Sequence, residues 1–194
     1  IVTDQDPDSL TRDHGRVDVA IDFTLPEAVP SNLPRLAARG INVVVGTTGW
    51  QAHEAALRAV VAQSGTAVLA SANFSLGVNL FMLLAEESAR RFGPHADFGA
   101  WIHELHHSAK KDAPSGTALM LKRAMEHAGY EKRIDMSSTR AGAFPGTHEV
   151  GFDALTETVT LTHAVRDRAV FAHGALEAAR WIKDRQGWFT MDDM

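Results

Sequence analysis

The chain contains no cysteine among its 194 residues. This absence excludes a disulfide framework and any thiol nucleophile, and it suits a reducing compartment, so we expect a cytoplasmic protein. The chain also has no apolar run approaching about 18 residues, the length that a membrane-spanning helix needs. We therefore expect no membrane partner, and the sequence shows no pattern typical of a signal peptide.

The chain also has fewer basic side chains than acidic ones. The chain has 19 Lys and Arg residues against 24 Asp and Glu residues, which gives a net charge of −5 and a pI near 6.0. Because a nucleic-acid-binding surface is typically basic, this balance argues against a nucleic-acid partner. Hydrophobic residues make up 45% of the chain, a share that supports a substantial packed core in one large or two small domains.

Glycines in the spacing of a phosphate-binding loop are missing too. No two glycines are separated by a single residue, so the sequence has no Gly-x-Gly phosphate loop. Residues 1–16 are polar and turn-rich, and they are too few for a βαβ unit of about 30 residues. We interpret this segment as a connector and the chain as a partial record of a longer protein. The alternative is a protein that has lost tight dinucleotide binding.

Strand-like and helix-like segments alternate in the first third of the chain. Short β-branched runs predict strands at 17–22, 41–45 and 66–70, with helices at 30–39 and 51–63 between them. Strands that alternate with helices at this spacing predict a parallel, Rossmann-like sheet. The expected fold class of this part is α/β.

The remainder predicts an α+β unit with a mixed sheet. Strands are expected at 98–105 and 157–163, with the helix 116–128 laid across them. In the second of these strands Val159 and Leu161 alternate with threonines, which indicates one covered face.

Two further helices are expected to connect the parts. The helix at 76–91 is interpreted as a buried connector, and the helix at 174–182 returns the chain to the first part, followed by a terminal tail at 186–194. The core-facing stripe of the first connector is expected to consist of Leu76, Leu80, Phe81, Leu83 and Leu84.

Small and polar residues follow each of the first three expected strands. They are Thr24, then Gly46, Thr47 and Thr48, then Ser71, Ala72, Asn73 and Phe74. In open parallel sheets ligands bind at the carboxyl ends of the strands, so these residues form a candidate nucleotide site. Gly46 removes side-chain bulk, the threonines supply hydroxyls, and the Asn73 amide can pair with a carboxamide. Three ordinary turns are the alternative, because Gly, Thr and Asn are common there.

The segment 102–117 combines three kinds of chemistry. Its histidines can exchange protons near neutral pH, and Lys110 and Lys111 add positive charge. The run from Pro114 to Thr117 resembles an anion-binding turn, because a helix that starts there would present free backbone N–H groups to a carboxylate. A solvated surface turn is the alternative. Such a convergent polar set is typical of a small-molecule site.

The same segment contains His103-Glu104-Leu105-His106-His107, which matches the His-Glu-x-x-His pattern of zinc proteases. That pattern binds zinc only on a helix, where residues i and i+4 share a face. The preceding aromatic and β-branched run indicates a strand instead, and in a strand these positions are too far apart to chelate together. We therefore expect no metal site.

The motif Glu104-Leu105-His106-His107-x-x-Lys110-x-Asp112-Ala113-Pro114-Ser115-Gly116-Thr117-Ala118 closely resembles the signature of the dihydrodipicolinate reductase family. Three further blocks match the same family in order: Asp22-Phe23-Thr24-x-Pro26-Glu27, Val45-Gly46-Thr47-Thr48-Gly49 and Ala72-Asn73-Phe74-Ser75-x-Gly77-Val78-Asn79. Phe171-Ala172-His173-Gly174-Ala175 also matches, although the family more usually has Asn at His173. The resemblance spans about residues 17–194.

This resemblance implies NADH- or NADPH-dependent reduction of the cyclic dicarboxylate 4-hydroxy-tetrahydrodipicolinate in lysine and diaminopimelate biosynthesis. It assigns proton donation to His106, with Lys110 as second donor and charge stabiliser. It also implies that the substrate carboxylate is held by His107, Ser115, Gly116 and Thr117. The alternatives are a related amino-acid dehydrogenase of the same architecture and a non-catalytic dicarboxylate-binding module.

The resemblance also implies a domain division and an assembly. Residues 1–75 and 183–194 would form a partial dinucleotide-binding domain, and residues 76–182 a substrate-binding and oligomerisation domain. The expected assembly is a homotetramer. The choice between NADH and NADPH is normally made at the end of a strand that this sequence does not contain.

Overall fold

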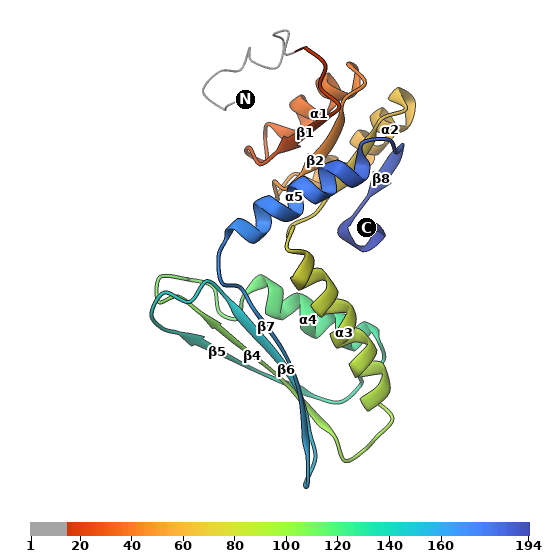
Figure 1. The fold of residues 1–194 in the computed structure, drawn as a ribbon. Coiled ribbons are helices and arrows are strands. Elements are labelled where there is room, and N and C mark those ends of the chain that lie inside the picture. The colour runs from red at the N-terminus through yellow and green to blue at the C-terminus, as the bar shows by residue number, and fades with distance from the viewer. Residues whose placement is uncertain (1–14) are drawn as a thin grey trace. The chain divides into compact units, whose positions relative to one another are not determined.

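The computed structural model describes residues 15–194 and divides into two compact units. Within the described residues, unit 1 comprises 15–76 and 171–194, and unit 2 comprises 77–170. Figure 1 shows the helices and strands of each. The expected connector at 1–16 lies outside the described residues apart from its last two positions.

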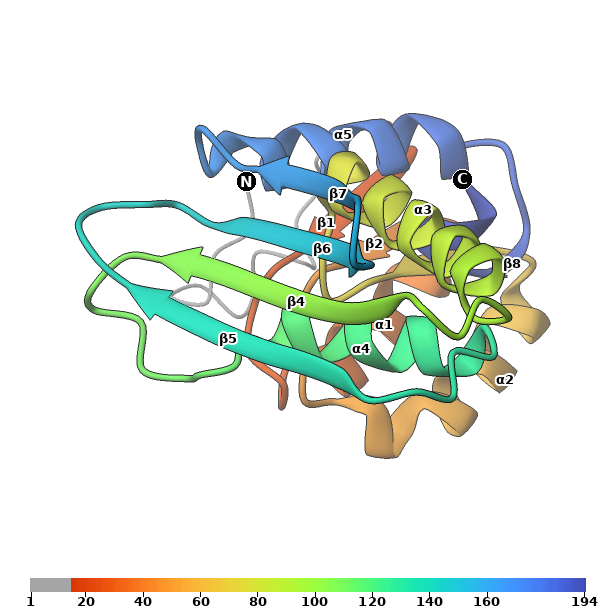
Figure 2. The ribbon, with the colours of Figure 1, turned by 90° about the horizontal axis from the view of Figure 1, so that it is seen from below.

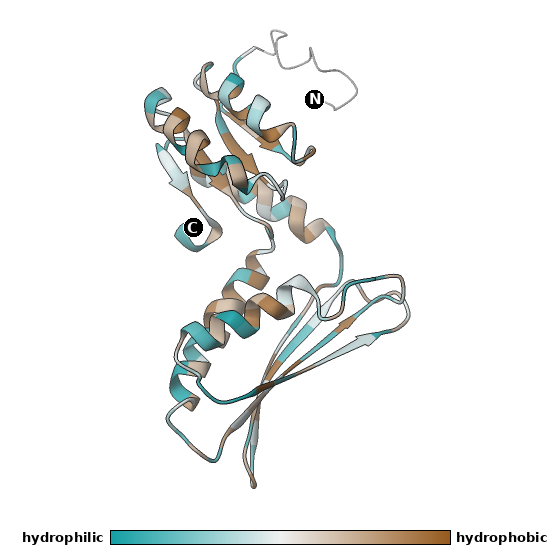
Figure 3. Ribbon diagram, turned by 180° about the vertical axis from the view of Figure 1, so that it is seen from behind, coloured by the Kyte–Doolittle hydropathy of each residue, from teal (hydrophilic) through white to brown (hydrophobic). Residues whose placement is uncertain are grey.

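Unit 1 is built on a parallel sheet, which confirms the Rossmann-like prediction. Sheet A has the strand order β1-β2-β3-β8, and every neighbouring pair is parallel. Its strands are β1 (Val19–Asp22), β2 (Asn42–Val45), β3 (Ala67–Ala70) and β8 (Gly187–Phe189). The hydropathy colouring of Figure 3 shows how apolar the central strands are. Burial on both faces explains this composition.

The terminal tail expected at 186–194 contains the fourth strand of sheet A. β8 pairs with β3 from Ala67 onward, and the 3-10 helix η3 (Met191–Asp193) follows it. Thr190 caps η3 by accepting a hydrogen bond from the Asp192 backbone N–H at 3.3 Å. A three-residue strand is too short to show the alternation from which strands are predicted.

Helices cover both faces of sheet A. On one face lie α1 (Val29–Ala37), the 3-10 helix η2 (Gln51–His53) and α2 (Glu54–Ser64), and on the other lies α5 (Ala169–Ile182). α5 begins five residues before the expected position 174.

α5 belongs to the core of unit 1, whereas the expected domain boundary at 182 assigns it to the second domain. Its side chains Ala175, Ala178 and Ile182 are buried with Leu69 of β3. The buried Asn42 holds its C-terminal end, donating hydrogen bonds to the carbonyls of Ile182 at 2.8 Å and Lys183 at 3.0 Å. This packing is a tertiary effect that the helical pattern alone does not contain.

Unit 2 is built on a mixed sheet, as predicted. Sheet B has the order β5-β4-β6-β7, in which β4 and β5 are parallel and the other pairs antiparallel. Its strands are β4 (Gly99–His106), β5 (Ile134–Arg140), β6 (Thr147–Asp153) and β7 (Thr158–Ala164). On β7, Leu161 packs against the core as the alternation predicts, whereas Val159 is 39% exposed.

Two helices cover one face of sheet B (Figure 1, Figure 2), namely α3 (Leu76–Phe92) and α4 (Gly116–His127). Their buried side chains form one core with Ile102 of β4 and Phe152 of β6. Among the described residues, no helix is both long and apolar enough to cross a bilayer.

The predicted core stripe of α3 is wrong for four of its five residues. Leu76, Leu80, Leu83 and Leu84 are 43–57% exposed, and only Phe81 is buried. The buried face of the helix instead consists of Val78, Phe81, Ala85 and Ala89. Both faces have helical spacing, and the alanines allow close approach to the sheet, so periodicity does not reveal which face points inward.

Candidate active site

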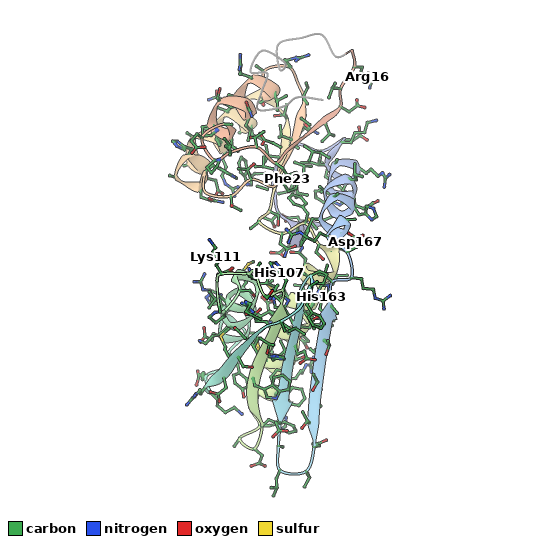
Figure 4. The ribbon with its side chains drawn as sticks, turned by 90° about the vertical axis from the view of Figure 1, so that its left-hand side faces the viewer. Arg16, Phe23, His107, Lys111, His163 and Asp167 are labelled. Atoms are coloured by element: carbon green, nitrogen blue, oxygen red, sulfur yellow. The ribbon has the colours of Figure 1, made fainter. Side chains whose placement is uncertain are left out.

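The topology of sheet B brings four polar side chains to one end. Strands β4, β5 and β7 run in the same direction, and β6 runs oppositely. The last residues of β4 and β5, His106 and Arg140, therefore lie beside His148 at the start of β6, which pairs with His163 of β7. Figure 4 shows His163 at this end of the sheet, together with His107.

Glu104 of β4 contacts two members of this group, His106 and Arg140, and is only 1% exposed. Arg140 donates to both of its oxygens, at 3.0 Å to Oε2 and 2.6 Å to Oε1. The backbone N–H of Ser115 donates to Oε1 at 3.2 Å, and the Nδ1 of His106 contacts Oε2. Burial raises the pKa of Glu104, but hydrogen bonds from Arg140, Ser138 and His106 outweigh it and lower that pKa to about 2. Glu104 is therefore ionised at neutral pH.

His106 is held by one ring nitrogen and open at the other. Because Glu104 is ionised and can only accept, the Nδ1 of His106 carries the proton of their hydrogen bond. The Nε2 has no hydrogen-bond partner among the described residues, and a Cβ added at Gly146 would lie 3.0 Å from it. Burial lowers the pKa of His106, the Glu104 carboxylate opposes this, and the charges of Lys110 and Arg140 lower it further.

The loop after β4 carries the other predicted catalytic residue. The Lys110 ammonium contacts both carboxylate oxygens of Asp112, at 2.7 and 2.9 Å, and this bond lowers the pKa of Asp112. Arg140 also donates to the Asp112 carbonyl at 2.6 Å. The backbone N–H of Lys110 donates to the His107 carbonyl at 3.1 Å. A single guanidinium thus ties the Lys110 loop to the carboxylate that holds His106.

The predicted anion-binding turn begins α4. Ser115 is the N-cap residue, and its Oγ accepts a hydrogen bond from the Ala118 backbone N–H at 3.2 Å. Gly116 is exposed, with no atom within 4 Å of a Cβ added to it, and Thr117 is half-buried beside it. The first turn of α4 therefore has an uncovered backbone at its positive end, which suits a carboxylate.

His148 adds a contact that sequence reasoning missed. It is 4% exposed, and its Nε2 lies 3.1 Å from the Ser115 Oγ. Burial lowers the pKa of His148 to about 4, and the neighbouring charge of His106 adds to the effect. Its Nδ1 is buried without a partner among the described residues. Only its core-facing position on a strand could have indicated this role, and that strand was not predicted.

The zinc alternative fails on geometry. His103 points to the face of β4 opposite Glu104 and His106, where it contacts Glu149 at 3.1 Å and Thr139 at 3.0 Å. Glu104, His106 and His148 do bring ligand atoms within 4.8 Å of one another. The guanidinium of Arg140 contacts both Glu104 oxygens, however, so a cation already neutralises the carboxylate that a metal would need.

The candidate nucleotide residues gather at one edge of sheet A. Thr24, Gly46 and Ser71 follow β1, β2 and β3, whose carboxyl ends meet there because the strands are parallel. The Ser71 backbone N–H donates to the Val45 carbonyl at 3.1 Å, which joins two of the loops. A cavity of about 130 Å³ lies beside them and includes Thr47, Ser71 and Ala72 in its lining.

Asp22 organises the first two loops. The buried carboxylate accepts hydrogen bonds from the Thr24 backbone N–H at 2.9 Å, the Thr24 hydroxyl at 2.6 Å and the Thr47 hydroxyl at 3.3 Å. The Thr47 hydroxyl is thus turned into the protein, and Thr48 is left exposed. The Phe23 ring lies against Gly46, where any side chain would collide with it. A side chain at position 46 would thus require the exposed Phe23 ring to move.

The third loop is held by its own side chains and by the core. The Asn73 Oδ1 accepts from the Ser75 backbone N–H at 2.9 Å, and the Ser71 hydroxyl donates to the Asn73 carbonyl at 2.9 Å. Phe74 is 1% exposed and belongs to the core beside α5. Phe74 therefore holds the loop in place with its side chain and can offer a ligand only its backbone.

Comparisons with known proteins identify the family and the fold. The family model described as "Dihydrodipicolinate reductase, C-terminus" matches residues 77–194, and "Dihydrodipicolinate reductase, N-terminus" matches residues 1–74. A dipicolinate-bound dihydrodipicolinate reductase from a Paenisporosarcina species superposes with a TM-score of 0.79 at 22% identity. That alignment covers 91% of this chain and 74% of the other, and it shows a shared fold.

Two curated relatives show the family directly, and both are named 4-hydroxy-tetrahydrodipicolinate reductase. The protein from Christiangramia forsetii is 36% identical, over 92% of this chain and 79% of its own length. The protein from Rhodopseudomonas palustris is 41% identical, over 91% of this chain and 72% of its own length. The chain therefore belongs to the dihydrodipicolinate reductase family of NAD(P)H-dependent oxidoreductases, which acts in lysine and diaminopimelate biosynthesis.

Proposed function

We propose that this chain reduces 4-hydroxy-tetrahydrodipicolinate to tetrahydrodipicolinate, with His106 as the proton donor and Lys110 as the stabilising cation. The observation that carries the proposal is the arrangement at the end of β4. There the open Nε2 of His106, the Lys110 loop and the uncovered first turn of α4 are all tied to Glu104 or to its partner Arg140. A proton donor, a cation and a carboxylate site are the parts that this substrate requires.

The chemistry follows from charge. Loss of the substrate hydroxyl as water would leave a conjugated ring, to which a bound reduced nicotinamide would supply the hydride. The resulting anionic enamine would then need one proton. His106 would then deliver the proton from its Nε2, because its Nδ1 is engaged by Glu104. Lys110 would stabilise the developing negative charge. A bound dianion would also raise the pKa of His106, which burial lowers in the free protein.

A ring carboxylate would be held by the first turn of α4. The backbone N–H groups of Gly116 and Thr117 lie at the positive end of the helix, and the Thr117 hydroxyl can donate a further hydrogen bond. His107, half-buried in the loop before Lys110, would contribute a ring N–H. Ser115 would act mainly by fixing the turn, since its hydroxyl is already bonded to Ala118 and lies beside His148.

The nucleotide would be held at the carboxyl edge of sheet A. The fit rests on the bare backbone at Gly46, the exposed Thr48 and the cavity beside Ser71 and Ala72. Thr24, Thr47, Asn73 and Phe74 would support these contacts by holding the three loops, as their hydrogen bonds and burial indicate. The family uses a pyridine nucleotide, and whether this chain prefers NADH or NADPH is decided by assaying both.

The proposal is tested by following the oxidation of NADH and NADPH with freshly generated 4-hydroxy-tetrahydrodipicolinate. Lys110→Ala should lower kcat by about 10²- to 10³-fold, the usual effect of losing one preorganised electrostatic donor. His106→Gln should lower it by about 10²- to 10⁴-fold. His127→Gln, on the exposed end of α4, is the control and should match the wild type. Wild-type rates in both active-site variants would refute the assignment.

We also propose that the protein assembles as a homotetramer through unit 2. The face of sheet B opposite α3 and α4 supports this, because among the described residues no helix packs on it. That face displays Thr158, Thr160 and Thr162 of β7. Analytical ultracentrifugation is the test, and a monomer at micromolar concentration would refute it.

A further inference from the structure

Two charged residues beside the proposed catalytic pair, Glu104 and Arg140, form an ion pair that is largely shielded from solvent. Glu104 is 1% exposed, and its partner Arg140 has a side chain only 17% exposed. Burying an ion pair is costly and often contributes little to stability, so its retention calls for a role other than folding.

The contacts of the pair point to that role. One Glu104 oxygen faces the Nδ1 of His106, and the other accepts the Ser115 N–H that begins the carboxylate-binding turn. Arg140 contacts both oxygens and also donates to the Asp112 carbonyl in the loop of Lys110. The proton donor, the cation loop and the turn are thus fixed to one buried charge pair.

We propose that Glu104 and Arg140 are positioning residues for proton transfer, which fix the Nδ1–H form of His106 and hold its Nε2 toward the substrate. The inference rests on the proposed role of His106. A carboxylate that accepts from Nδ1 places the transferable proton on Nε2 when the ring is charged, and it stabilises that charged ring. Gly146 complements the arrangement, because a side chain there would crowd the Nε2.

The charges that face His106 determine the sign of the expected change. Glu104 raises the pKa of His106, whereas burial and the charges of Lys110 and Arg140 lower it. His148 also faces it from β6, with ring centroids 5.1 Å apart. Replacing Glu104 by Gln removes the one group in this set that favours the charged ring. The pKa of His106 should therefore fall further.

Glu104→Gln keeps the shape of the side chain and can still accept from Ser115, but its amide can donate to the Nδ1 and so favour the wrong tautomer. We expect kcat to fall by about 10- to 10³-fold, which is less than the loss of the carboxylate in a serine-protease triad causes. The alkaline limb of the pH–rate profile should move to lower pH, and KM should change less than about threefold.

The matched control is Glu149→Gln, which removes the carboxylate beside His103 on the other face of the sheet. This control should keep the wild-type profile.

A second measurement does not depend on the folding of Glu104→Gln. Nitrogen-15 NMR of the wild-type histidines, with His106 assigned by the signal missing from His106→Gln, reads the tautomer directly. The neutral ring should carry its proton on Nδ1. A neutral ring protonated on Nε2 would overturn the proposal, as would a folded Glu104→Gln with the kcat and alkaline limb of the wild type.

The two proposals fail in different ways. If His106→Gln loses the alkaline limb while Glu104→Gln keeps it, His106 is the donor and the positioning role is wrong. If His106→Gln keeps the alkaline limb, the assignment of His106 as proton donor and the positioning role of Glu104 and Arg140 are both wrong.

Discussion

The buried His148 should make unit 2 sensitive to mild acid. Burial lowers its pKa from 6.5 to about 4. In the unfolded chain this histidine therefore takes up a proton as the pH falls through 6.5, whereas in the folded protein it stays neutral until about pH 4. The contribution of His148 to the free energy of unfolding is therefore fully present above pH 6.5 and is lost progressively below it. At about 1.4 kcal/mol per pKa unit, the loss between about pH 7 and pH 4.5 is roughly 2 to 3 kcal/mol.

The assay is urea unfolding followed by circular dichroism at several pH values in this range. His148→Gln should lose roughly 2 to 3 kcal/mol less than the wild type over the range, because it has no proton to gain. The control His127→Gln removes an exposed histidine from the same unit and should lose as much as the wild type. Glu104 also gains protons in the unfolded chain as the pH approaches 4.5, but it does so in the wild type and in His148→Gln alike, so its effect cancels from their difference. Equal losses in the wild type and in His148→Gln would refute the reasoning.

Two further predictions concern binding and packing. Thr117→Val should weaken the binding of dipicolinate by about 10- to 100-fold in a calorimetric titration, because it removes one hydrogen bond to a charged group. Equal affinity in the wild type and the variant would show that Thr117 is not part of the carboxylate site. Gly174→Ala should destabilise unit 1 by about 3 kcal/mol or more, because its Cβ would overlap the carbonyl of Phe74. It should also weaken nucleotide binding by displacing that loop, and an unchanged melting temperature would contradict the close contact.

The sequence predicted sheet A well because its signals are local. β1, β2 and β3 are short, largely apolar runs separated by helices of ordinary length, and this pattern has few other solutions. The family motifs likewise located the segment from Glu104 to Thr117 by its residues alone. That His106 and Ser115 share one carboxylate, however, follows from the pairing of strands and not from spacing along the chain.

What escaped prediction depends on tertiary contacts. Arg140 and His148 reach the site because β5 and β6 flank β4, and neither strand has a strong apolar alternation: β5 contains Ser137, Ser138 and Thr139 in succession. Glu104 is 36 positions from its partner Arg140, and Ser115 is 33 positions from its partner His148. A local pattern cannot identify such partners.

The central claim is that His106 supplies the proton, and the pH dependence of kcat/KM tests it most directly. In the wild type the rate should fall as the pH rises past the pKa of His106, which burial places below 6.5 in the free protein. That alkaline limb should vanish in His106→Gln and survive in the slower Lys110→Ala. An unchanged alkaline limb in His106→Gln would show that the proton comes from another group.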